Sequence, residues 1–318
     1  DELRFGSIVT QFKSLNDSGE LVVDDGEAES LETETSSRPE NFTCSSPLPI
    51  ASDTADPRAM TYLIAAAAID RVIADAKADR IIAISEQTKR DIVEFYKIPA
   101  RKIRVCYQSC NPTFFDRVSE EEKQRIRDRY QLPSQFFLYV GSIIERKNLG
   151  RVIEAMDAIR NVTDMPLVVI GTGDRYEKQV RQSVRERNLS GRVIFLSDSQ
   201  AAKLSSTFQN ASDFPAIYQL ATAMIYPSIF EGFGIPVLEA LASELPVITS
   251  NLSCLPEAGG PGSLLIDPYS SEAMAEALLR IVNEPDLIQT MKATGKKHAD
   301  LFTPDITARR VMDLYETL

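Results

Sequence analysis

The stretch Tyr226-Pro-Ser-Ile-Phe-Glu-Gly-Phe-Gly-Ile-Pro-Val-Leu-Glu239 decides the fold of this chain. It follows an apolar run over residues 221–226, which predicts a short buried strand. Pro236 suits the first position of a helix, because its fixed φ is already helical and its missing N–H is no loss there. We expect that helix to run to about Ser243. The stretch therefore predicts a strand, a tight turn and a helix, which is the repeating unit of an α/β fold.

The turn between this strand and this helix is a candidate phosphate cradle. Gly232 and Gly234 flank Phe233, so the backbone can turn sharply or approach a ligand closely. The free amides and the positive end of the helix dipole would point at whatever lies above the turn. Glu231 and Glu239 bracket the turn, and carboxylates accept hydrogen bonds from sugar or ribose hydroxyls. A Glu in a first helical turn is also favourable without a ligand, so both interpretations stay open on these residues alone.

A second constellation lies in Tyr139-Val-Gly-Ser-Ile-Ile-Glu-Arg-Lys-Asn-Leu149. A strand ends in Gly141, and two cations, Arg146 and Lys147, follow before the next helix. A diphosphate favours such a pair, because arginine offers a planar fork and lysine a mobile point charge. A solvated charge pair at the start of a helix is the alternative, since exposed lysines and arginines are common.

Residues 231–239 resemble the E-x7-E signature of the retaining glycosyltransferases of family 4, which have the GT-B fold. The resemblance continues through residues 239–242, 246–250 and 255–257, and it covers residues 60–318. It implies a doubly wound, Rossmann-like parallel sheet in a C-terminal domain. It also implies a nucleoside-diphosphate sugar as the donor substrate, no cofactor and no bound metal.

The same resemblance assigns roles to individual residues. Lys147 matches the diphosphate lysine of the family, and Arg146 takes the place of the arginine that the family often has directly after the glycine, where this chain has Ser142. Glu239 would accept the ribose hydroxyls, while Glu231 and the amides of the glycine turn would hold the sugar and its phosphate. The candidate catalytic residues are thus Glu231, Lys147 and Arg146, and the candidate donor-binding residues are Gly141, Ser142, Gly171, Gly232, Phe233, Gly234 and Glu239.

A third glycine pair, Gly171-Thr-Gly173, ends a predicted strand over residues 167–170. It lacks the third glycine of a dinucleotide fingerprint, and it is either a simple turn or the equivalent of the family's glycine loop near the nucleotide. The strand over residues 193–196 is followed by Ser197, where the family usually has Gly. Residues 198–212 then form a longer loop than is usual in the family.

Composition narrows the class of protein. The chain has 318 residues, 43% of them hydrophobic, and a net charge of −11. Residues 1–60 hold 13 acidic and 4 basic residues, a net charge of −9. The sequence has no basic stripe, so we do not expect it to bind nucleic acid. No apolar run approaches the ~18 residues of a membrane helix, so we expect a cytoplasmic protein with at most peripheral membrane contact.

The cysteines are irregularly spaced, which predicts ordinary thiols at Cys44, Cys106, Cys110 and Cys254. The only histidine, His298, is expected at the surface.

The order of composition and motifs predicts four segments. Residues 1–57 are acidic and poorly ordered or irregular. Residues 58–115 resemble the last strand, helix and strand of the family's acceptor-side domain and are expected to be a remnant of it: strands over residues 80–84 and 102–107, and between them a helix capped by Ser85 with Ile92, Val93 and Phe95 on one apolar face. Residues 120–130 predict a charged helix on the surface. Residues 116–300 form the nucleotide-sugar-binding domain, where strands and helices alternate regularly from residue 135. Residues 301–318 predict a helix, and the resemblance implies that it packs back on the N-terminal part.

The resemblance implies a metal-independent hexosyltransferase that moves a sugar from a nucleoside-diphosphate sugar to a saccharide or lipid-linked acceptor with retention, in polysaccharide or glycoconjugate synthesis. The alternative is a defective donor-binding module or a subunit that needs a partner. It stays open because the resemblance begins near residue 60, so we expect the first half of the N-terminal domain, including the histidine that the family usually places there, to be missing or replaced.

Overall fold

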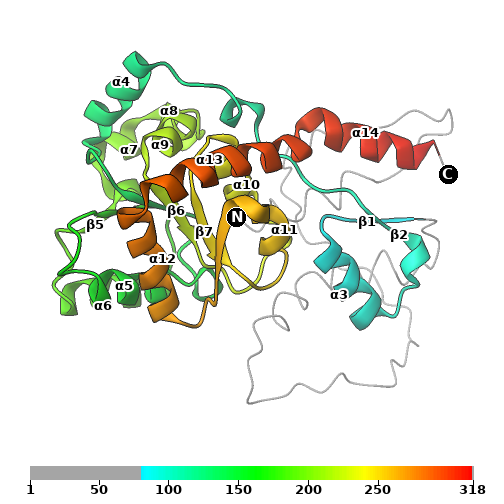
Figure 1. Ribbon diagram of the computed structural model, residues 1–318, viewed down its shortest axis with the longest axis horizontal. Coiled ribbons are helices and arrows are strands. Elements are labelled where there is room, and N and C mark those ends of the chain that lie inside the picture. Colours follow the sequence, from blue (N-terminus) through cyan, green and yellow to red (C-terminus); the bar gives the residue numbers. More distant parts are fainter. Residues whose placement is uncertain (1–79, 317–318) are drawn as a thin grey trace, which may run out of the picture. The chain divides into compact units, whose positions relative to one another are not determined.

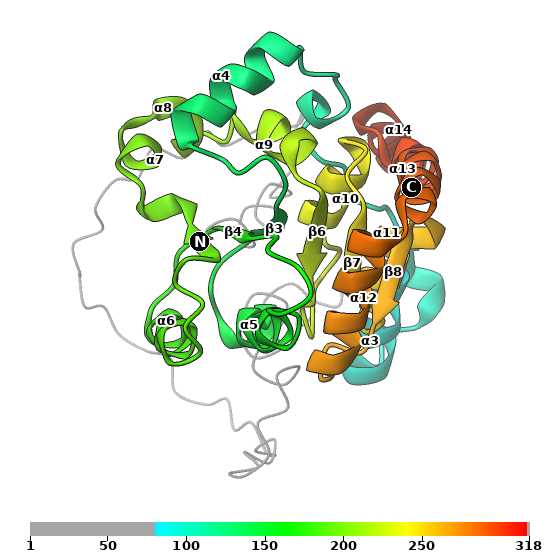
Figure 2. The same cartoon turned by 60° about the vertical axis from the view of Figure 1, so that its left-hand side comes forward.

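The computed structural model describes residues 80–316 of the chain. Their centre is a six-stranded, all-parallel sheet, visible in Figures 1 and 2. Four of its strands have every residue buried, as expected when helices cover both faces of a parallel sheet. In sheet order, the strands are β5 (Val193–Phe195), β4 (Leu167–Ile170), β3 (Phe137–Val140), β6 (Ala223–Tyr226), β7 (Val247–Ser250) and β8 (Ser263–Ile266).

Successive strand residues point to opposite faces, and this divides the core into two clusters. Phe137 and Tyr139 of β3 join one cluster, and Leu138 and Val140 join the other. The first cluster is covered by α5 (Leu149–Ala158), α6 (Arg175–Glu186) and α12 (Ser271–Asn283). The second is covered by α4 (Glu120–Tyr130), α7 (Gln200–Leu204), α8 (Ser206–Gln209), α9 (Phe214–Leu220), α10 (Ile235–Ala242) and α11 (Leu255–Gly259). Figure 2 shows these helices on opposite sides of the sheet.

The strand order places a topological switch point between β3 and β6. From β3 the chain moves outward through β4 to β5, then returns to β6 on the other side of β3 and continues to β7 and β8. In such sheets the loops that leave neighbouring strands in opposite directions open a crevice at the carboxyl ends, and ligands bind there. The fold therefore brings together the loops that follow Val140 and Tyr226.

A separate two-stranded parallel sheet precedes this domain. β1 (Ile81–Ala83) pairs with β2 (Ile103–Val105), and α3 (Glu86–Tyr96) connects them. Ser85 caps α3, since its side chain accepts a hydrogen bond from the amide of Thr88. This strand, helix and strand confirm the prediction for residues 80–107. Two 3-10 turns, η1 (Ala100–Lys102) and η2 (Pro112–Phe114), follow α3 and β2, and Phe114 lies in the main core.

Two helices end the described part of the chain, and the second of them contacts the segment after the small sheet. α13 (Pro285–Ala299) leads through η6 (Asp300–Phe302) to α14 (Pro304–Tyr315). Thr307 of α14 donates to the carbonyl of Tyr107 at 3.1 Å, and the Arg310 guanidinium lies over the Tyr107 ring at 5.7 Å. The last helix thus contacts the segment that follows β2.

Several local predictions were wrong. Helix α10 begins at Ile235, so Pro236 is its second residue and Glu239 lies beyond its first turn. Phe95, expected on the buried face of α3, is 51% exposed, whereas Asp91 is buried. The apolar spacing there fits more than one face, and the face that includes Asp91 and Ile92 is the one that packs.

The predicted surface character of α4 and of His298 also needs correction. Ile126 and Tyr130 of α4 are buried, because the helix covers α9. His298 is half-buried, and its Nε2 donates to the carbonyl of Glu257 at 2.9 Å. The long segment over residues 198–212 holds two short helices, α7 and α8, instead of an open loop. Residues 1–79 and Cys44 lie outside the described residues, so the predictions made for them stay predictions.

Candidate active site

The two loops at the switch point are bonded to each other. The loop after β3 runs through the 3-10 turn η3 (Glu145–Lys147), and the loop after β6 leads to α10. The amide of Ile229 donates to the carbonyl of Arg146 at 2.8 Å, and the Ser228 hydroxyl donates to the same carbonyl at 3.0 Å. Arg146 is thus anchored by its backbone against the loop that carries Glu231.

Asn148 fixes the end of the first loop. It adopts the left-handed conformation with φ 62°, which asparagine tolerates better than most residues. Its buried side-chain amide donates to the carbonyl of Pro268 at 2.6 Å and to that of Pro227 at 3.3 Å. These bonds set the direction in which Arg146 and Lys147 leave the backbone.

The predicted catalytic residues form one charge cluster. The Glu231 carboxylate lies 2.8 Å from an Arg146 guanidinium nitrogen and 2.9 Å from Lys147 Nζ. Only 7% of Glu231 is exposed. The Tyr226 hydroxyl donates to Glu231 at 3.0 Å and is hydrogen-bonded to Lys147. Two cations face one anion, so the cluster carries a net positive charge, which suits an anionic ligand.

Opposing effects set the pKa values in this cluster. Burial raises the pKa of Glu231, but the Lys147 and Arg146 cations lower it by more, so its net pKa lies below the usual range. Burial lowers the pKa of Lys147, and Glu231 acts in the opposite direction. Burial and the Glu231 charge raise the pKa of Tyr226 far above its usual value. Near neutral pH, Glu231 is therefore an anion and Tyr226 a neutral hydrogen-bond donor.

The glycine turn leads directly from this cluster into α10. Gly234 adopts φ 104°, and a Cβ there would lie 2.8 Å from a methyl group of Leu255. Gly234 is also the N-cap of α10 and provides no capping side chain for the first amides of the helix. The Phe233 side chain is buried and packs against the rings of Tyr107 and Phe302, which also contact each other. Phe233 can therefore contact a ligand above the turn only through its backbone.

Glu239 has a different environment from the charge cluster. It is half-buried, and its carboxylate accepts a hydrogen bond from the Tyr218 hydroxyl of α9 at 2.9 Å. Burial, and secondly the Glu239 charge, raise the pKa of Cys110 to about 12. Glu239 thus faces α9 and the segment near Cys110, so the structure brings Glu231 together with Arg146 and Lys147, while Glu239 has a separate bonding partner.

The loops after β3 and β4 pack backbone against backbone. Gly141 and Gly171 adopt φ values of 147° and 149°, and a Cβ on Gly171 would lie 1.9 Å from the carbonyl oxygen of Gly141. The amide of Gly171 donates to the Ser197 hydroxyl at 3.0 Å. The carbonyl of Ser142 lies 3.5 Å from the Tyr139 hydroxyl. The close approach of the two loops therefore requires glycine at position 171. At Gly141 a Cβ would lie 3.7 Å from the Lys147 side chain, so there only the positive φ favours glycine.

Replacing Gly171 by alanine is expected to lower the free energy of unfolding by about 3 kcal/mol, because the new Cβ forces the loops apart in an unfavourable backbone conformation. Urea denaturation would measure this change. Gly191→Ala is the control, since a Cβ there meets nothing within 4 Å. Equal stability of the two variants would show that the two loops can separate without cost.

Sequence reasoning missed three members of the site. Tyr226 is the last residue of an apolar strand, so it was treated as core, yet its hydroxyl joins Lys147 to Glu231. Ser253 and Cys254 precede α11, and both donate to the backbone carbonyl of Glu231, at 2.9 and 3.1 Å. The one available signal for Tyr226 was its place at the carboxyl end of a strand, since the two cations, Arg146 and Lys147, were expected at the same edge of the sheet.

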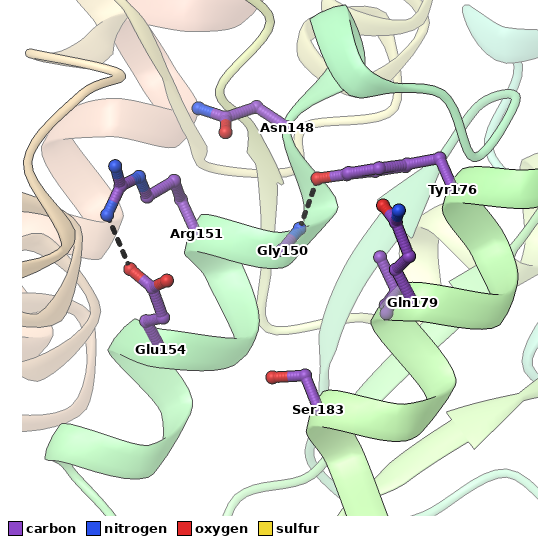
Figure 3. Close-up of a pocket in the computed structure, with 8 residues that line it drawn as sticks. Asn148, Gly150, Arg151, Glu154, Tyr176, Gln179 and Ser183 are labelled. Carbon is purple, nitrogen blue, oxygen red and sulfur yellow. Dashed lines mark hydrogen bonds and ion pairs between the residues drawn. The ribbon is translucent and has the colours of Figure 1, made fainter.

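A polar hollow lies outside the charge cluster of Glu231, Arg146 and Lys147. Figure 3 shows it between α5 and α6, where Arg151 pairs with Glu154 at 2.8 Å and the Gly150 amide donates to the Tyr176 hydroxyl at 3.0 Å. Its volume is about 320 Å³. Two pairs of its polar groups are thus bonded to each other. Within residues 80–316, no three His, Cys, Asp or Glu side chains are grouped so that they could hold a metal ion, and no helix is long and apolar enough to cross a membrane.

A doubly wound parallel sheet with a charged site at its switch point is typical of domains that bind nucleotides. A family model described as Glycosyl transferases group 1 matches residues 120–298, which is more than half of the chain. The chain belongs to this family of glycosyltransferases. The match covers both loops of the charge cluster and confirms the family predicted from residues 231–239.

Curated relatives and solved structures agree with this family. The chain is 27% identical over 244 residues to O-antigen chain mannosyltransferase B of Escherichia coli, covering 76% of this chain and 61% of the relative. It is 29% identical over 212 residues to O-antigen chain mannosyltransferase RfbU of Salmonella typhimurium, covering 67% and 53%. The chain thus spans between about half and three fifths of the length of these relatives.

Two crystal structures support the fold. A glycosyltransferase from Rickettsia africae superposes with a TM-score of 0.66 at 21% identity, covering 76% of this chain and 64% of that one. Anabaena Alr3699/HepE in complex with UDP-glucose gives a TM-score of 0.70 at 17% identity, covering 82% and 70%. With the parallel sheet, they confirm the predicted GT-B-like α/β fold.

Proposed function

We propose that this chain transfers a hexose from a nucleoside-diphosphate sugar to an acceptor hydroxyl, with retention of the anomeric configuration. The observation that carries the proposal is the pairing of Glu231 with Arg146 and Lys147 at the switch point of the sheet. A diphosphate is the ligand that best matches two adjacent cations next to a glycine turn and an uncapped helix start. The neighbouring carboxylate suits the hydroxyls of the attached sugar.

The names of similar proteins support the choice of donor and acceptor. Two curated relatives are O-antigen chain mannosyltransferases, and a structure with the same fold was solved with UDP-glucose. We therefore propose a nucleoside-diphosphate hexose as the donor and a growing saccharide or a lipid-linked saccharide as the acceptor, in polysaccharide synthesis.

The proposed mechanism relies on electrostatic stabilisation of the leaving group. As the bond between the sugar and the diphosphate breaks, negative charge grows on the terminal phosphate. Lys147 and Arg146 would stabilise that charge without a metal ion. The acceptor hydroxyl would then attack from the face that the diphosphate leaves and give its proton to the departing phosphate oxygen, with Glu231 and the turn amides holding the sugar. Because the new bond forms on the face from which the old one broke, the configuration is retained.

Incubation with a panel of nucleoside-diphosphate hexoses and saccharide acceptors tests the proposal. We expect release of the nucleoside diphosphate, a product whose anomeric configuration by NMR matches that of the donor, and an unchanged rate with a metal chelator present. An inverted product would contradict retention. Calorimetric binding of donor without transfer would instead identify a donor-binding module.

Replacing Glu239 by alanine is expected to weaken donor binding by about 1–3 kcal/mol, because one charged acceptor for the ribose hydroxyls is lost. Isothermal titration calorimetry with the donor would measure this loss. Glu276→Ala, at an exposed position of α12, is the control. Unchanged donor affinity in Glu239→Ala would remove Glu239 from the donor site and leave its bond to Tyr218 as a structural contact.

A further inference from the structure

Glu257 of α11 binds the start of α3, which is 170 residues away in the sequence. One carboxylate oxygen accepts the Glu86 amide at 2.7 Å and the Tyr107 hydroxyl at 3.1 Å. The other accepts the Gln87 amide at 2.8 Å. A carboxylate that receives three hydrogen bonds from neighbouring segments is a strong local anchor, because bonds to a charged acceptor are the strong ones.

These bonds complete the capping of α3. The first amides of a helix have no partner within the helix, and the helix dipole makes them favourable for an anion. Ser85 caps only the amide of Thr88. Glu257 takes the two amides before it, so a residue of the glycosyltransferase domain provides the remaining caps of α3.

The capped turn of α3 in turn holds the glycine turn of the candidate active site. The Thr88 hydroxyl donates to the carbonyl of Gly232 at 3.3 Å. On the other side, Ser253 and Cys254 donate to the carbonyl of Glu231. The backbone that connects Glu231 to Gly232 is therefore held between α3 and the residues that precede α11.

The backbone of Glu257 is fixed as well. Its carbonyl accepts the bond from His298, whose ring packs edge-on against Phe302 at 5.0 Å. Gly260, three residues later, leaves no room for a side chain, because a Cβ there would lie 2.5 Å from the His298 ring. The carboxylate of Glu257 thus projects toward α3 from a rigid support.

We propose that Glu257 is a positioning residue: by capping α3 it holds Thr88 against Gly232 and so fixes the glycine turn that serves the donor. The part of this inference that concerns the donor rests on the proposed function. The part that concerns the turn does not, since it requires only that loss of the carboxylate loosens α3 and the glycine turn together.

The test is hydrogen exchange of the Glu257→Gln variant, measured at residues 86–88 and 232–234. Glutamine has the same shape but has one acceptor oxygen and no charge, so we expect exchange at both segments to become about tenfold faster. Glu94→Gln, the same substitution at an exposed site on α3, should change neither segment. Faster exchange at residues 86–88 alone would overturn the inference, because α3 would then loosen without the turn, and so would unchanged exchange at both segments.

Substitutions of Thr88 provide a second test, which distinguishes a positioning role of Glu257 from a role in stability alone. Thr88→Val removes the hydroxyl, and we expect it to weaken donor binding about as much as Glu257→Gln, with the double variant no weaker than either one, since both act on Gly232. Thr88→Ser should restore affinity. Additive losses would overturn the inference. If the parent chain binds no donor, the proposed function fails, while the exchange experiment still decides the role of Glu257.

Discussion

Replacing Lys147 by methionine is expected to lower the rate of sugar transfer by about 10²–10³-fold, because the variant loses a preorganised cation that faces the developing charge of the diphosphate. The effect is large since Lys147 Nζ is almost enclosed, with 11% of its side chain exposed, and water cannot easily replace it. Turnover at saturating donor would measure the loss.

The control for this variant is Lys178→Met, on an exposed part of α6, which should transfer sugar at the parent rate. Circular dichroism would show that both variants are folded. Arg146→Met should reduce the rate less, because Arg146 is more exposed and also donates to the carbonyl of Phe230 at 2.8 Å. A Lys147→Met variant with parent turnover would remove the lysine from the reaction.

Replacing Glu231 by glutamine is expected to lower the free energy of unfolding by about 3 kcal/mol at neutral pH, because two partly buried cations lose their counter-ion. Urea denaturation would measure this difference. Glu154→Gln is the control: its pair with Arg151 is exposed, so its removal should cost less than about 1 kcal/mol.

The pH dependence of this difference tests its electrostatic origin. The pKa of Glu231 is lowered in the folded chain, so its stabilisation is present above the unfolded pKa of about 4.3 and is lost as the pH falls through the folded value. The gap between the parent and Glu231→Gln should therefore be constant from about pH 7 to 5 and shrink below about pH 4.3. A gap that does not change over this range would indicate that Glu231 contributes through packing alone.

Sequence reasoning succeeded where one physical cause dominates. The strand over residues 167–170 was predicted at its observed bounds, because an apolar run between polar segments has few alternatives to a buried parallel strand. The resemblance to the glycosyltransferase family implied that Lys147 and Glu231 serve one site, and the structure places them 2.9 Å apart. The strand order that sets β3 beside β6 was not predicted from the sequence.

Sequence reasoning failed where a residue could contact several different parts of the chain. The apolar spacing of α3 did not show whether Phe95 or Asp91 would be buried, since that depends on which face the rest of the chain covers. The bonds of Glu257 to α3 and of Tyr218 to Glu239 join distant segments, and no local pattern marks them. Tyr226 was missed because an aromatic residue in an apolar strand looks like core even when its hydroxyl serves the site.

The central claim is that the cluster of Glu231, Arg146 and Lys147 binds the diphosphate of the donor, and a crystal structure with a bound nucleoside diphosphate tests it most directly. The account predicts terminal phosphate oxygens at about 2.7–2.9 Å from Lys147 Nζ and from the Arg146 guanidinium. A diphosphate bound instead in the polar hollow between α5 and α6 (Figure 3), with the Glu231 cluster unchanged, would contradict it.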